Sequence, residues 1–364
     1  MKRIVISGYH GFANSGDEAL LRAIVESIRK KCPDADITVL SKIPDVTASD
    51  YGVKSVYRYN FLKLAGIFRK SDLLIFGGGS LLQDATSSKS LLYYLCVIRL
   101  ALLMGTKVML YANGIGPLKR RYSRILTRRV LNKVDIITLR DDNSDIELQN
   151  IGVTRPQIVI TADPAFTLHF DDVRSGKEIL QSAGVAEGEK FAVVSVRDWK
   201  DAESGFEKKV AALCDRMYEK YGVKPVFLPM QYPCDAEISK RIISISKCPC
   251  GIIDKELEVA DIFSVIAHSD FTVGMRLHTL IYATALGVPA IALSYDPKIT
   301  AFVKSINQPL CADVGSLGSD ELTDLLDELM LSIDERRCDI QKALVELRGK
   351  AEENADFAIR LLNE

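Results

Sequence analysis

Arg276 and His278 stand two residues apart, where a short apolar run, FTVG, gives way to a helical pattern. Tyr295 and Lys298 follow the next apolar run, and Arg197 follows an earlier one, FAVVSV. Guanidinium groups bind carboxylates and phosphates through two parallel hydrogen bonds, so these cations predict a site for a small ligand that carries both groups. A histidine among them is the natural proton carrier near neutral pH. The plainer alternative makes Arg276 a surface ion-pair partner, His278 a packed histidine and Lys298 a solvated lysine.

Four stretches of the first half place glycines and polar side chains after apolar runs: SGYHGFANSGDEALL, LLIFGGGSLLQD, YANGIGPL and ITLRDDNS. Glycine lets the backbone approach a ligand, and a helix start favours an anion. Gln83 and Asp84 carry groups that suit sugar hydroxyls. The first stretch is equally an ordinary helix cap at Ser15 or Asp17, and the alternative for the triple glycine is a tight turn between a strand and a helix. The spacing differs from the GxGxxG pattern that holds dinucleotides.

The elements that must position these residues alternate between short apolar strands and helical patterns in both halves. This order predicts an α/β fold, with parallel sheets covered by helices on both faces. We expect two Rossmann-like, doubly wound domains facing a cleft, with the ligand at the carboxyl ends of the strands. The expected bounds are residues 1–172 for the first domain, 185–312 for the second, and 318–364 for C-terminal helices that pack back on the first domain. A polar linker or edge helix is expected over 171–189.

The composition narrows the class of protein. A length of 364 residues fits two domains, and a net charge of −1 gives no reason to expect nucleic acid as a partner. The N-terminal stretch MKRIVISGYHG begins directly with a strand, so we expect a cytoplasmic location. Eight scattered cysteines fit reduced thiols, and the close pair Cys248 and Cys250 lacks the spacing of a zinc site.

A basic segment, KRRYSRILTRR, fits an amphipathic helix with cations on one face. Such a helix is typical either of a solvated surface or of one that lies on anionic lipid or meets a diphosphate. Its cations are Lys119, Arg120, Arg121, Arg124, Arg128 and Arg129.

These motifs resemble those of the polysaccharide pyruvyl transferase family, in particular its cell-surface-anchoring (S-layer, secondary cell wall polysaccharide) type. The resemblance runs from residue 1 to about residue 305 and rests on GYHGFANSGDEALL, FGGGSLLQD, NGIGPL, LRDDNS, ADPAF, SVRD and MRLHTLIYATALGVPAIALSYDPK. It implies a GT-B-like fold and the transfer of pyruvate from phosphoenolpyruvate onto two hydroxyls of a sugar as a 4,6-ketal. In the surface-anchoring branch, the acceptor is N-acetylmannosamine of a lipid-diphosphate-linked wall-polysaccharide precursor.

The resemblance also implies roles for residues. His278 is the expected catalytic acid. The expected phosphoenolpyruvate-binding residues are Arg197, Arg276, Leu277, Tyr295 and Lys298. The expected acceptor-binding residues are Gly11, Asn14, Asp17, Gly78, Gly79, Gln83, Asp84, Asn113, Arg140 and Gln231. Neither a metal nor a cofactor is expected, because fixed cations neutralise the leaving phosphate. The expected partners are the donor, a lipid-linked sugar and, at the inner face of the cell membrane, the membrane surface.

Two other functions share part of this pattern. A nucleotide-sugar glycosyltransferase would use the same kind of cleft and cations, although the sequence offers no acidic partner for a ribose. A non-catalytic sugar-phosphate binding protein would keep the arginines without needing His278.

Overall fold

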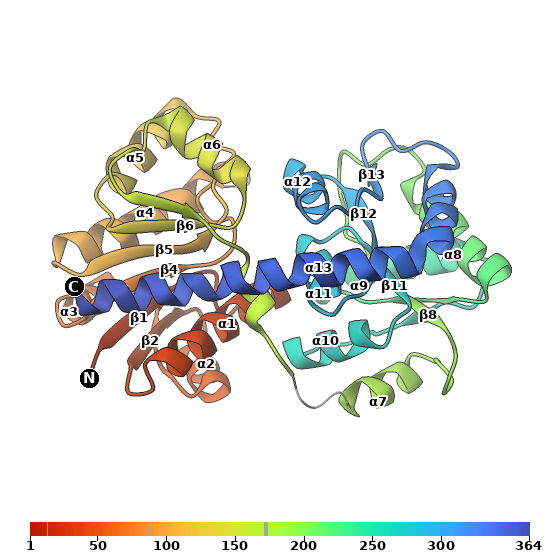
Figure 1. The fold of residues 1–364 in the computed structure, drawn as a ribbon, viewed down its shortest axis with the longest axis horizontal. Helices are drawn as coiled ribbons and strands as arrows, with labels where there is room; N and C mark the ends of the chain where they lie inside the picture. Colours follow the sequence, from red (N-terminus) through yellow and green to blue (C-terminus); the bar gives the residue numbers. More distant parts are fainter. Residues whose placement is uncertain (13, 86, 171–173) are drawn as a thin grey trace. The chain divides into compact units, whose positions relative to one another are not determined.

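The computed structural model describes residues 1–12, 14–85, 87–170 and 174–364, with only the backbone described at 174–175. The chain divides into two compact units (Figure 1). The first comprises Met1–Leu168 together with Leu347–Glu364, and the second comprises His169–Glu346. The predicted α/β architecture with two parallel sheets is confirmed.

The first unit is built on a seven-stranded sheet in the order β3-β2-β1-β4-β5-β6-β7, in which every pairing is parallel. Its strands are β1 (Arg3–Ser7), β2 (Asp36–Ser41), β3 (Lys54–Tyr57), β4 (Leu73–Gly77), β5 (Lys107–Asn113), β6 (Ile136–Leu139) and β7 (Gln157–Ile160). Strands β1 and β4 are almost continuously apolar, as expected for strands buried on both faces.

Helices cover both faces of this sheet. They are α1 (Ser15–Lys31), α2 (Pro44–Tyr51), α3 (Phe61–Phe68), α4 (Ser88–Leu103), α5 (Arg121–Leu131), α6 (Asp142–Ile151) and the 3-10 helix η1 (Pro164–Thr167). Apolar side chains of α3, α4, α5 and α6 form one core. Side chains of α1 form a second core with those of the last helix, α13 (Glu321–Asn363).

A buried amide fixes the end of α13 in the first unit. Asn354 is fully buried, and its Oδ1 accepts hydrogen bonds from the hydroxyls of Thr138, at 2.5 Å, and Thr161, at 2.9 Å. Its Nδ2 donates to the carbonyl of Ala162 at 3.2 Å. Because an unsatisfied buried amide is costly, these bonds define one position for the helix on strands β6 and β7.

The second unit repeats the architecture with six parallel strands in the order β10-β9-β8-β11-β12-β13. The strands are β8 (Phe191–Ser195), β9 (Lys224–Phe227), β10 (Gly251–Ile252), β11 (Phe271–Gly274), β12 (Ala290–Ser294) and β13 (Cys311–Asp313). Its helices are α7 (Arg174–Ser182), α8 (Phe206–Tyr221), α9 (Cys234–Ile245), α10 (Val259–Ala267), α11 (Leu277–Ala285) and α12 (Pro297–Ser305).

The structure also contains elements that the sequence pattern did not predict. Helix α2, strand β3 and helix α3 fill the segment between β2 and β4, and α6 separates β6 from β7. The tail, expected as several helices, forms the single helix α13. Of the stretch expected as a linker or edge helix, residues 174–182 form α7, and residues 171–173 lie outside the described residues.

Candidate functional site

In the second unit, the predicted donor-binding residues follow strands that lie next to one another. Arg197 comes two residues after β8, Arg276 two residues after β11, and Tyr295 directly after β12. Strand β11 pairs with both β8 and β12, in parallel. The carboxyl ends of neighbouring parallel strands lie at the same sheet edge, so the three side chains start from adjacent positions.

Arg276 is held by an acidic partner. It is the N-cap residue of α11, and its Nε and Nη2 donate to the two carboxylate oxygens of Asp235 at 3.0 and 2.6 Å. Nη2 also donates to the side-chain oxygen of Gln231 at 3.0 Å. Gln231, expected on the acceptor side, therefore lies in the second unit beside a donor-side arginine. These bonds hold the guanidinium in a defined orientation, and the Asp235 carboxylate neutralises part of its positive charge.

Arg197 lies among aromatic rings. Its Nη1 donates to the hydroxyl of Tyr295 at 3.0 Å, and its Cζ lies 5.0 Å from that ring and 5.6 Å from the ring of Trp199. Its buried Nε has no hydrogen-bond partner among the described residues. A buried donor without a partner is uncommon, and a bound anion would satisfy it.

His278 is the second residue of α11, and Leu277 is the first. The His278 ring is half-buried, its Nε2 is inaccessible to solvent, and its centroid lies 5.9 Å from that of Tyr282. The ring therefore sits at a helix start, one residue beyond Leu277 and two beyond Arg276.

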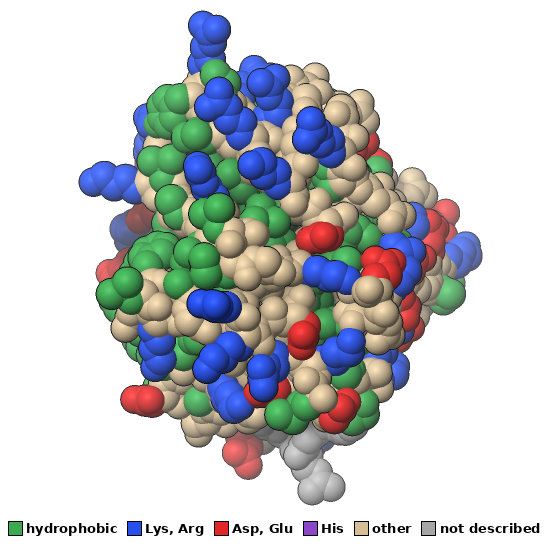
Figure 2. Space-filling view, turned by 90° about the vertical axis from the view of Figure 1, so that its left-hand side faces the viewer, with side chains coloured by type: hydrophobic (Ala, Val, Ile, Leu, Met, Phe, Trp, Pro, Cys, Tyr) green, Lys and Arg blue, Asp and Glu red, His purple; other side chains and the backbone are tan. Residues whose placement is uncertain are grey.

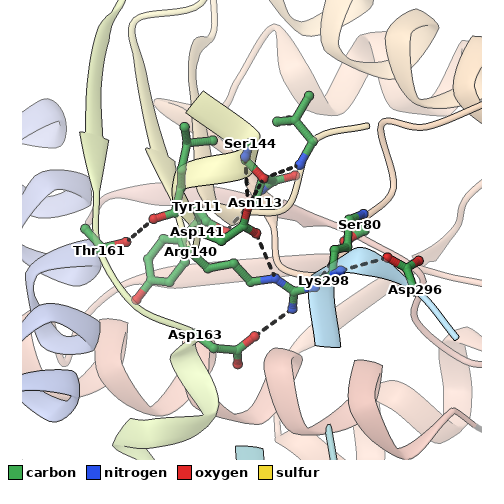
Figure 3. Close-up of polar contacts among 12 residues, drawn as sticks. Ser80, Tyr111, Asn113, Arg140, Asp141, Ser144, Thr161, Asp163, Asp296 and Lys298 are labelled. Atoms are coloured by element: carbon green, nitrogen blue, oxygen red, sulfur yellow. Dashed lines mark hydrogen bonds and ion pairs between the residues drawn. The ribbon is translucent and has the colours of Figure 1, made fainter. Parts of the chain in front are cut away.

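Lys298 lies in the first turn of α12, which follows β12. Its backbone N–H donates to the N-cap carboxylate of Asp296 at 3.0 Å (Figure 3). Lys298 thus lies at the same sheet edge as Tyr295, which precedes it by three residues.

In the first unit, the triple glycine makes a turn that only glycine fits. Gly78 has φ +65°, and a Cβ there would lie 2.7 Å from the Leu20 side chain. Gly79 has φ +70°, and a Cβ there would lie 3.2 Å from Oδ1 of Asp17. This loop therefore packs directly against the start of α1 and brings its backbone next to the Asp17 carboxyl group.

Asp17 is the buried carboxyl group of this region, 8% exposed. Burial raises its pKa from 3.8 to about 7, and the negative charge of Glu18 acts in the same direction. Arg140 and Arg58 oppose this rise in pKa. A carboxyl group that titrates near neutral pH is suited to accept or donate a proton.

Arg140 is the centre of a polar network at the ends of β4, β6 and β7 (Figure 3). Its Nη1 donates to Asp163 Oδ2 at 2.7 Å, and its Nη2 donates to the Ser80 hydroxyl at 3.0 Å. Asp163 is nearly fully buried and also caps η1, accepting from the N–H of Ala165 at 3.0 Å. Arg140 therefore joins the triple-glycine loop to the loop that follows β7.

Several predicted acceptor residues bond to the backbone. Asp84 accepts from the N–H groups of Lys119 and Arg120 at 2.7 and 2.9 Å. Burial would raise the Asp84 pKa, but these two N–H donors, together with the Ser123 hydroxyl and the charge of Arg120, hold the pKa below its usual value. Asn113 is fully buried and donates to the carbonyls of Phe76 and Tyr111 at 2.8 and 3.1 Å.

The remaining predicted acceptor residues lie near the same loops. Asn14 is the N-cap of α1, and its Oδ1 accepts from the N–H of Gly16 at 3.1 Å. The Gly11 N–H donates to Glu18 Oε1 at 2.8 Å. Gln83 is half-buried in the segment before α4. The loop before α1 is therefore shaped by hydrogen bonds between its own residues and the first residues of the helix.

Sequence reasoning missed a buried cation with aromatic neighbours. Arg58, which follows β3, is 2% exposed and donates to the Gly8 carbonyl at 3.2 Å. Its Cζ lies 4.4 Å from the ring of Tyr93 and 5.1 Å from that of Phe12. Burial, with a smaller effect of Arg58, lowers the pKa of His10 from 6.5 to about 3. The sequence did contain one indication of this cation, because Arg58 stands between two tyrosines in YRYN.

The described residues contain neither a cluster of metal ligands nor a membrane-spanning helix. No group of three or more His, Cys, Asp or Glu side chains there could hold a metal ion. No helix in that part of the chain is both long and apolar enough to cross a membrane.

Comparison with known proteins identifies the family. The family model named polysaccharide pyruvyl transferase matches residues 14–297. The amylovoran biosynthesis protein AmsJ of Erwinia amylovora is 22% identical over 376 residues, which cover 86% of this chain and 89% of AmsJ.

Solved structures share the fold. A UDP complex of MnaA from S. aureus has a TM-score of 0.66 at 14% identity, covering 100% of this chain and 98% of that one. HepE from Anabaena, in complex with UDP and glucose, has a TM-score of 0.67 at 11% identity and full coverage of both chains. These likenesses establish a GT-B-like fold. The family match, which spans most of the chain, shows that the protein belongs to the polysaccharide pyruvyl transferases.

Proposed function

We propose that this transferase moves the pyruvyl group of phosphoenolpyruvate onto two hydroxyls of a sugar, forming a 4,6-ketal and releasing phosphate. Membership of the family supports pyruvyl transfer in polysaccharide biosynthesis. The observation that carries the choice of donor is the sheet edge of the second unit, where Arg197 and Arg276 follow neighbouring strands. Phosphoenolpyruvate presents a carboxylate and a phosphate on three carbons, which two separate guanidinium groups match.

Each donor-side residue has a distinct part in this proposal. Arg197 offers one anionic group its Nε, which has no hydrogen-bond partner in the described part of the chain, while the Tyr295 hydroxyl and the Trp199 ring hold its orientation. Arg276 binds the second group from the orientation that Asp235 and Gln231 give it. Lys298 adds positive charge, and Leu277 contributes the N–H at the start of α11.

His278 supplies the proton that starts the reaction. Protonation of the methylene carbon converts it to a methyl group and makes the neighbouring carbon electrophilic. One sugar hydroxyl adds to that carbon and loses its proton, and the bond to the phosphate oxygen breaks. The second hydroxyl then adds to the same carbon, loses its proton to the released phosphate, and closes the ketal. Phosphoenolpyruvate and a diol thus give the ketal and inorganic phosphate, with fixed cations stabilising the leaving group.

The acceptor binds to the first unit in this proposal. Asp17 is the group suited to take the proton of the attacking hydroxyl, because its pKa is about 7. Arg140 and the triple-glycine loop define the surroundings of that carboxyl group. Asp84, Asn113 and Asn14 shape the loops that the sugar contacts.

The acceptor and location follow from the resemblance of the motifs to the surface-anchoring type. The acceptor is N-acetylmannosamine of a lipid-diphosphate-linked wall-polysaccharide precursor, and the product serves S-layer anchoring. The enzyme acts in the cytoplasm at the inner face of the membrane.

Phosphate release with lipid-linked acceptors tests the proposal. The purified full chain is incubated with phosphoenolpyruvate and a lipid-linked disaccharide that ends in N-acetylmannosamine, and parallel reactions use N-acetylglucosamine at that position or no acceptor. We expect phosphate only with the first acceptor, whose mass rises by one pyruvyl ketal. Consumption of a nucleotide sugar without use of phosphoenolpyruvate would identify a glycosyltransferase instead. Phosphoenolpyruvate binding without turnover on any acceptor would favour a binding protein.

A further inference from the structure

Acidic residues are nearly absent from one long part of the chain. Between residues 51 and 134 the acidic residues are Asp72 and Asp84, although the full sequence has 48 Asp and Glu. Asp84 is buried and bonded to two backbone N–H groups. Helices α3, α4 and α5 contain neither Asp nor Glu. In a chain of net charge −1, this segregation concentrates positive charge on one region.

These three helices form a continuous layer. Helix α4 contacts both α3 and α5, and the inner sides of all three join one core on the first sheet. Their outer sides and flanking turns carry exposed cations. These are Lys63, Arg69, Lys70, Lys89, Arg99, Lys119, Arg120, Arg121, Arg124, Arg128, Arg129 and Lys133. Figure 2 shows many Lys and Arg side chains in the upper part of this unit, where α5 lies in Figure 1.

The same layer exposes large hydrophobic side chains. Leu62 on α3 is 91% exposed, and Leu103 at the end of α4 is 67% exposed. Exposed aromatic and aliphatic side chains accompany them. These are Tyr57, Tyr59, Phe61, Leu92 and Tyr122. Leucine, tyrosine and cations on helices that carry no acidic residue are the combination found where proteins lie in the interface of an anionic membrane.

A basic pocket lies at one side of this layer. It has a volume of about 300 Å³ and lies between α5 and the end of α6. Arg121, Arg124 and Arg128 share one face of α5 by their spacing and line the pocket with Lys119 and Asn150. Arg124 donates to the Asn150 carbonyl at 3.3 Å. Four cations around one pocket suit a phosphate-bearing headgroup.

We propose that the α3–α4–α5 layer docks on an anionic phospholipid bilayer, with its leucines and tyrosines in the interface and a lipid phosphate in the α5–α6 pocket. Charge complementarity favours a bilayer over a second copy of the same face, because two such faces would repel each other. The exposed leucines favour a bilayer over nucleic acid, which has no apolar interior to receive them. The docking surface contains none of the residues proposed to bind phosphoenolpyruvate or the sugar, so it stands or fails independently of the proposed reaction.

Vesicle flotation of the full chain tests this surface. The probes are phosphatidylcholine vesicles with and without a quarter of phosphatidylglycerol. We expect the wild type to bind only the anionic vesicles, and to bind them less tightly as salt rises. Each cation near an anionic surface contributes about fivefold in affinity. The variant with Arg121→Gln, Arg124→Gln and Arg128→Gln should therefore bind on the order of a hundredfold more weakly.

A matched control separates this surface from general electrostatics. Lys208→Gln, Lys255→Gln and Lys304→Gln remove the same charge from exposed positions of the second unit and should leave binding unchanged. Leu62→Ser keeps every charge and should weaken binding roughly tenfold through lost apolar contact. All variants change exposed residues, and circular dichroism verifies that they fold.

Four outcomes would overturn the proposal. The first is that the wild type does not bind anionic vesicles. The second is that the arginine variant and the lysine control lose affinity equally. The third is that Leu62→Ser binds like the wild type. The fourth is that the arginine variant changes the oligomeric state in the absence of lipid, which would assign the face to a contact between copies. Phosphate release in solution is measured in parallel and reports on the proposed reaction alone.

Discussion

The two sheets carry polar residues after their strands in different ways. In the first unit, Asp84, Asn113 and Asn14 bond to backbone groups, so they shape the loops in which they lie. In the second unit, Arg276 bonds to the side chains of Asp235 and Gln231, and Arg197 to that of Tyr295. The first arrangement fixes the path of the chain, whereas the second fixes the direction of a charged group.

This difference separates residues that only look like binding residues in the sequence from residues whose side chains can bind a substrate. A carboxylate that is buried and already bonded to two backbone N–H groups is poorly accessible to a sugar, as at Asp84. A guanidinium oriented through two of its nitrogens keeps further donors available, as at Arg276. The first unit has two exceptions. Burial sets the protonation of Asp17 near neutral pH, and Arg140 is oriented by the side chains of Asp163 and Ser80.

The largest expected effect comes from His278. We expect His278→Gln to lower kcat about a thousandfold, the effect of losing a general acid, while phosphoenolpyruvate still binds. Single-turnover phosphate release and calorimetric titration of phosphoenolpyruvate measure the two quantities. A variant that retains wild-type kcat would remove His278 from the chemistry.

The next effect concerns Asp17 and depends on pH. The folded pKa of Asp17 lies above its unfolded value of 3.8, so the folded state binds the proton more tightly and stability falls as pH rises from about 4 to about 7. Asp17→Asn removes this loss. Three pH units set an upper limit of about 4 kcal/mol of added stability at pH 8, with little change near pH 4.

Urea unfolding of Asp17→Asn at both pH values gives that difference directly. Activity should fall in the same variant, because the amide cannot accept a proton. Equal stabilisation at pH 4 and pH 8 would show that the Asp17 carboxyl group does not titrate as described.

Removal of Asp235 should destabilise the second unit by about 3 kcal/mol. Asp235→Ala leaves the guanidinium of Arg276, whose side chain is 15% exposed, without its buried carboxylate. Loss of one partner of a buried pair is costly because a charge stays unpaired. Affinity for phosphoenolpyruvate should also fall, since Arg276 loses its orientation. Thermal unfolding and calorimetry measure both effects.

Asp84→Ala in the first unit is the matched comparison for Asp235→Ala. It also removes a buried carboxylate, and it should lower stability by about 2 kcal/mol through two lost backbone caps. Affinity for phosphoenolpyruvate should stay unchanged. Equal losses of that affinity in both variants would contradict the distinction between loop-shaping and charge-orienting carboxylates.

The smallest expected effect comes from Tyr295→Phe. The ring stays against Trp199, and only the hydroxyl that accepts from Arg197 is lost. One hydrogen bond to a charged group contributes about 1.5 kcal/mol, so KM for phosphoenolpyruvate should rise about tenfold with kcat nearly unchanged. A fall in kcat alone would place the hydroxyl in the chemical step instead.

The fold was predictable where strands were long and apolar. Strands β1, β4, β5, β8, β11 and β12 read as buried runs followed by helical patterns, so two parallel sheets followed from the sequence. Strand β3 was missed because only one of its four side chains is buried, and β13 because it has three residues. Helices α2 and α3 have eight residues each, too few for a clear period.

Partners of the predicted site residues were less predictable than the residues themselves. MRLH marks Arg276, but its carboxylate partner Asp235 lies 41 positions earlier in the chain. Arg140 and Asp163 likewise follow two different strands. They are too far apart in the sequence for a local pattern to predict that they pair. The raised pKa of Asp17 depends on burial, which the helix-start sequence SGDE does not reveal.

Helix α13 has a consequence for how the protein is made. Its end supplies Asn354 and five buried apolar side chains to the first unit, yet these residues are translated after the whole second unit. The ribosome therefore releases the amino-terminal sheet with part of its core still missing. During that interval the uncovered α1 side of the sheet is exposed to chaperones and proteases, and the nascent chain closes it only when residues 347–364 arrive.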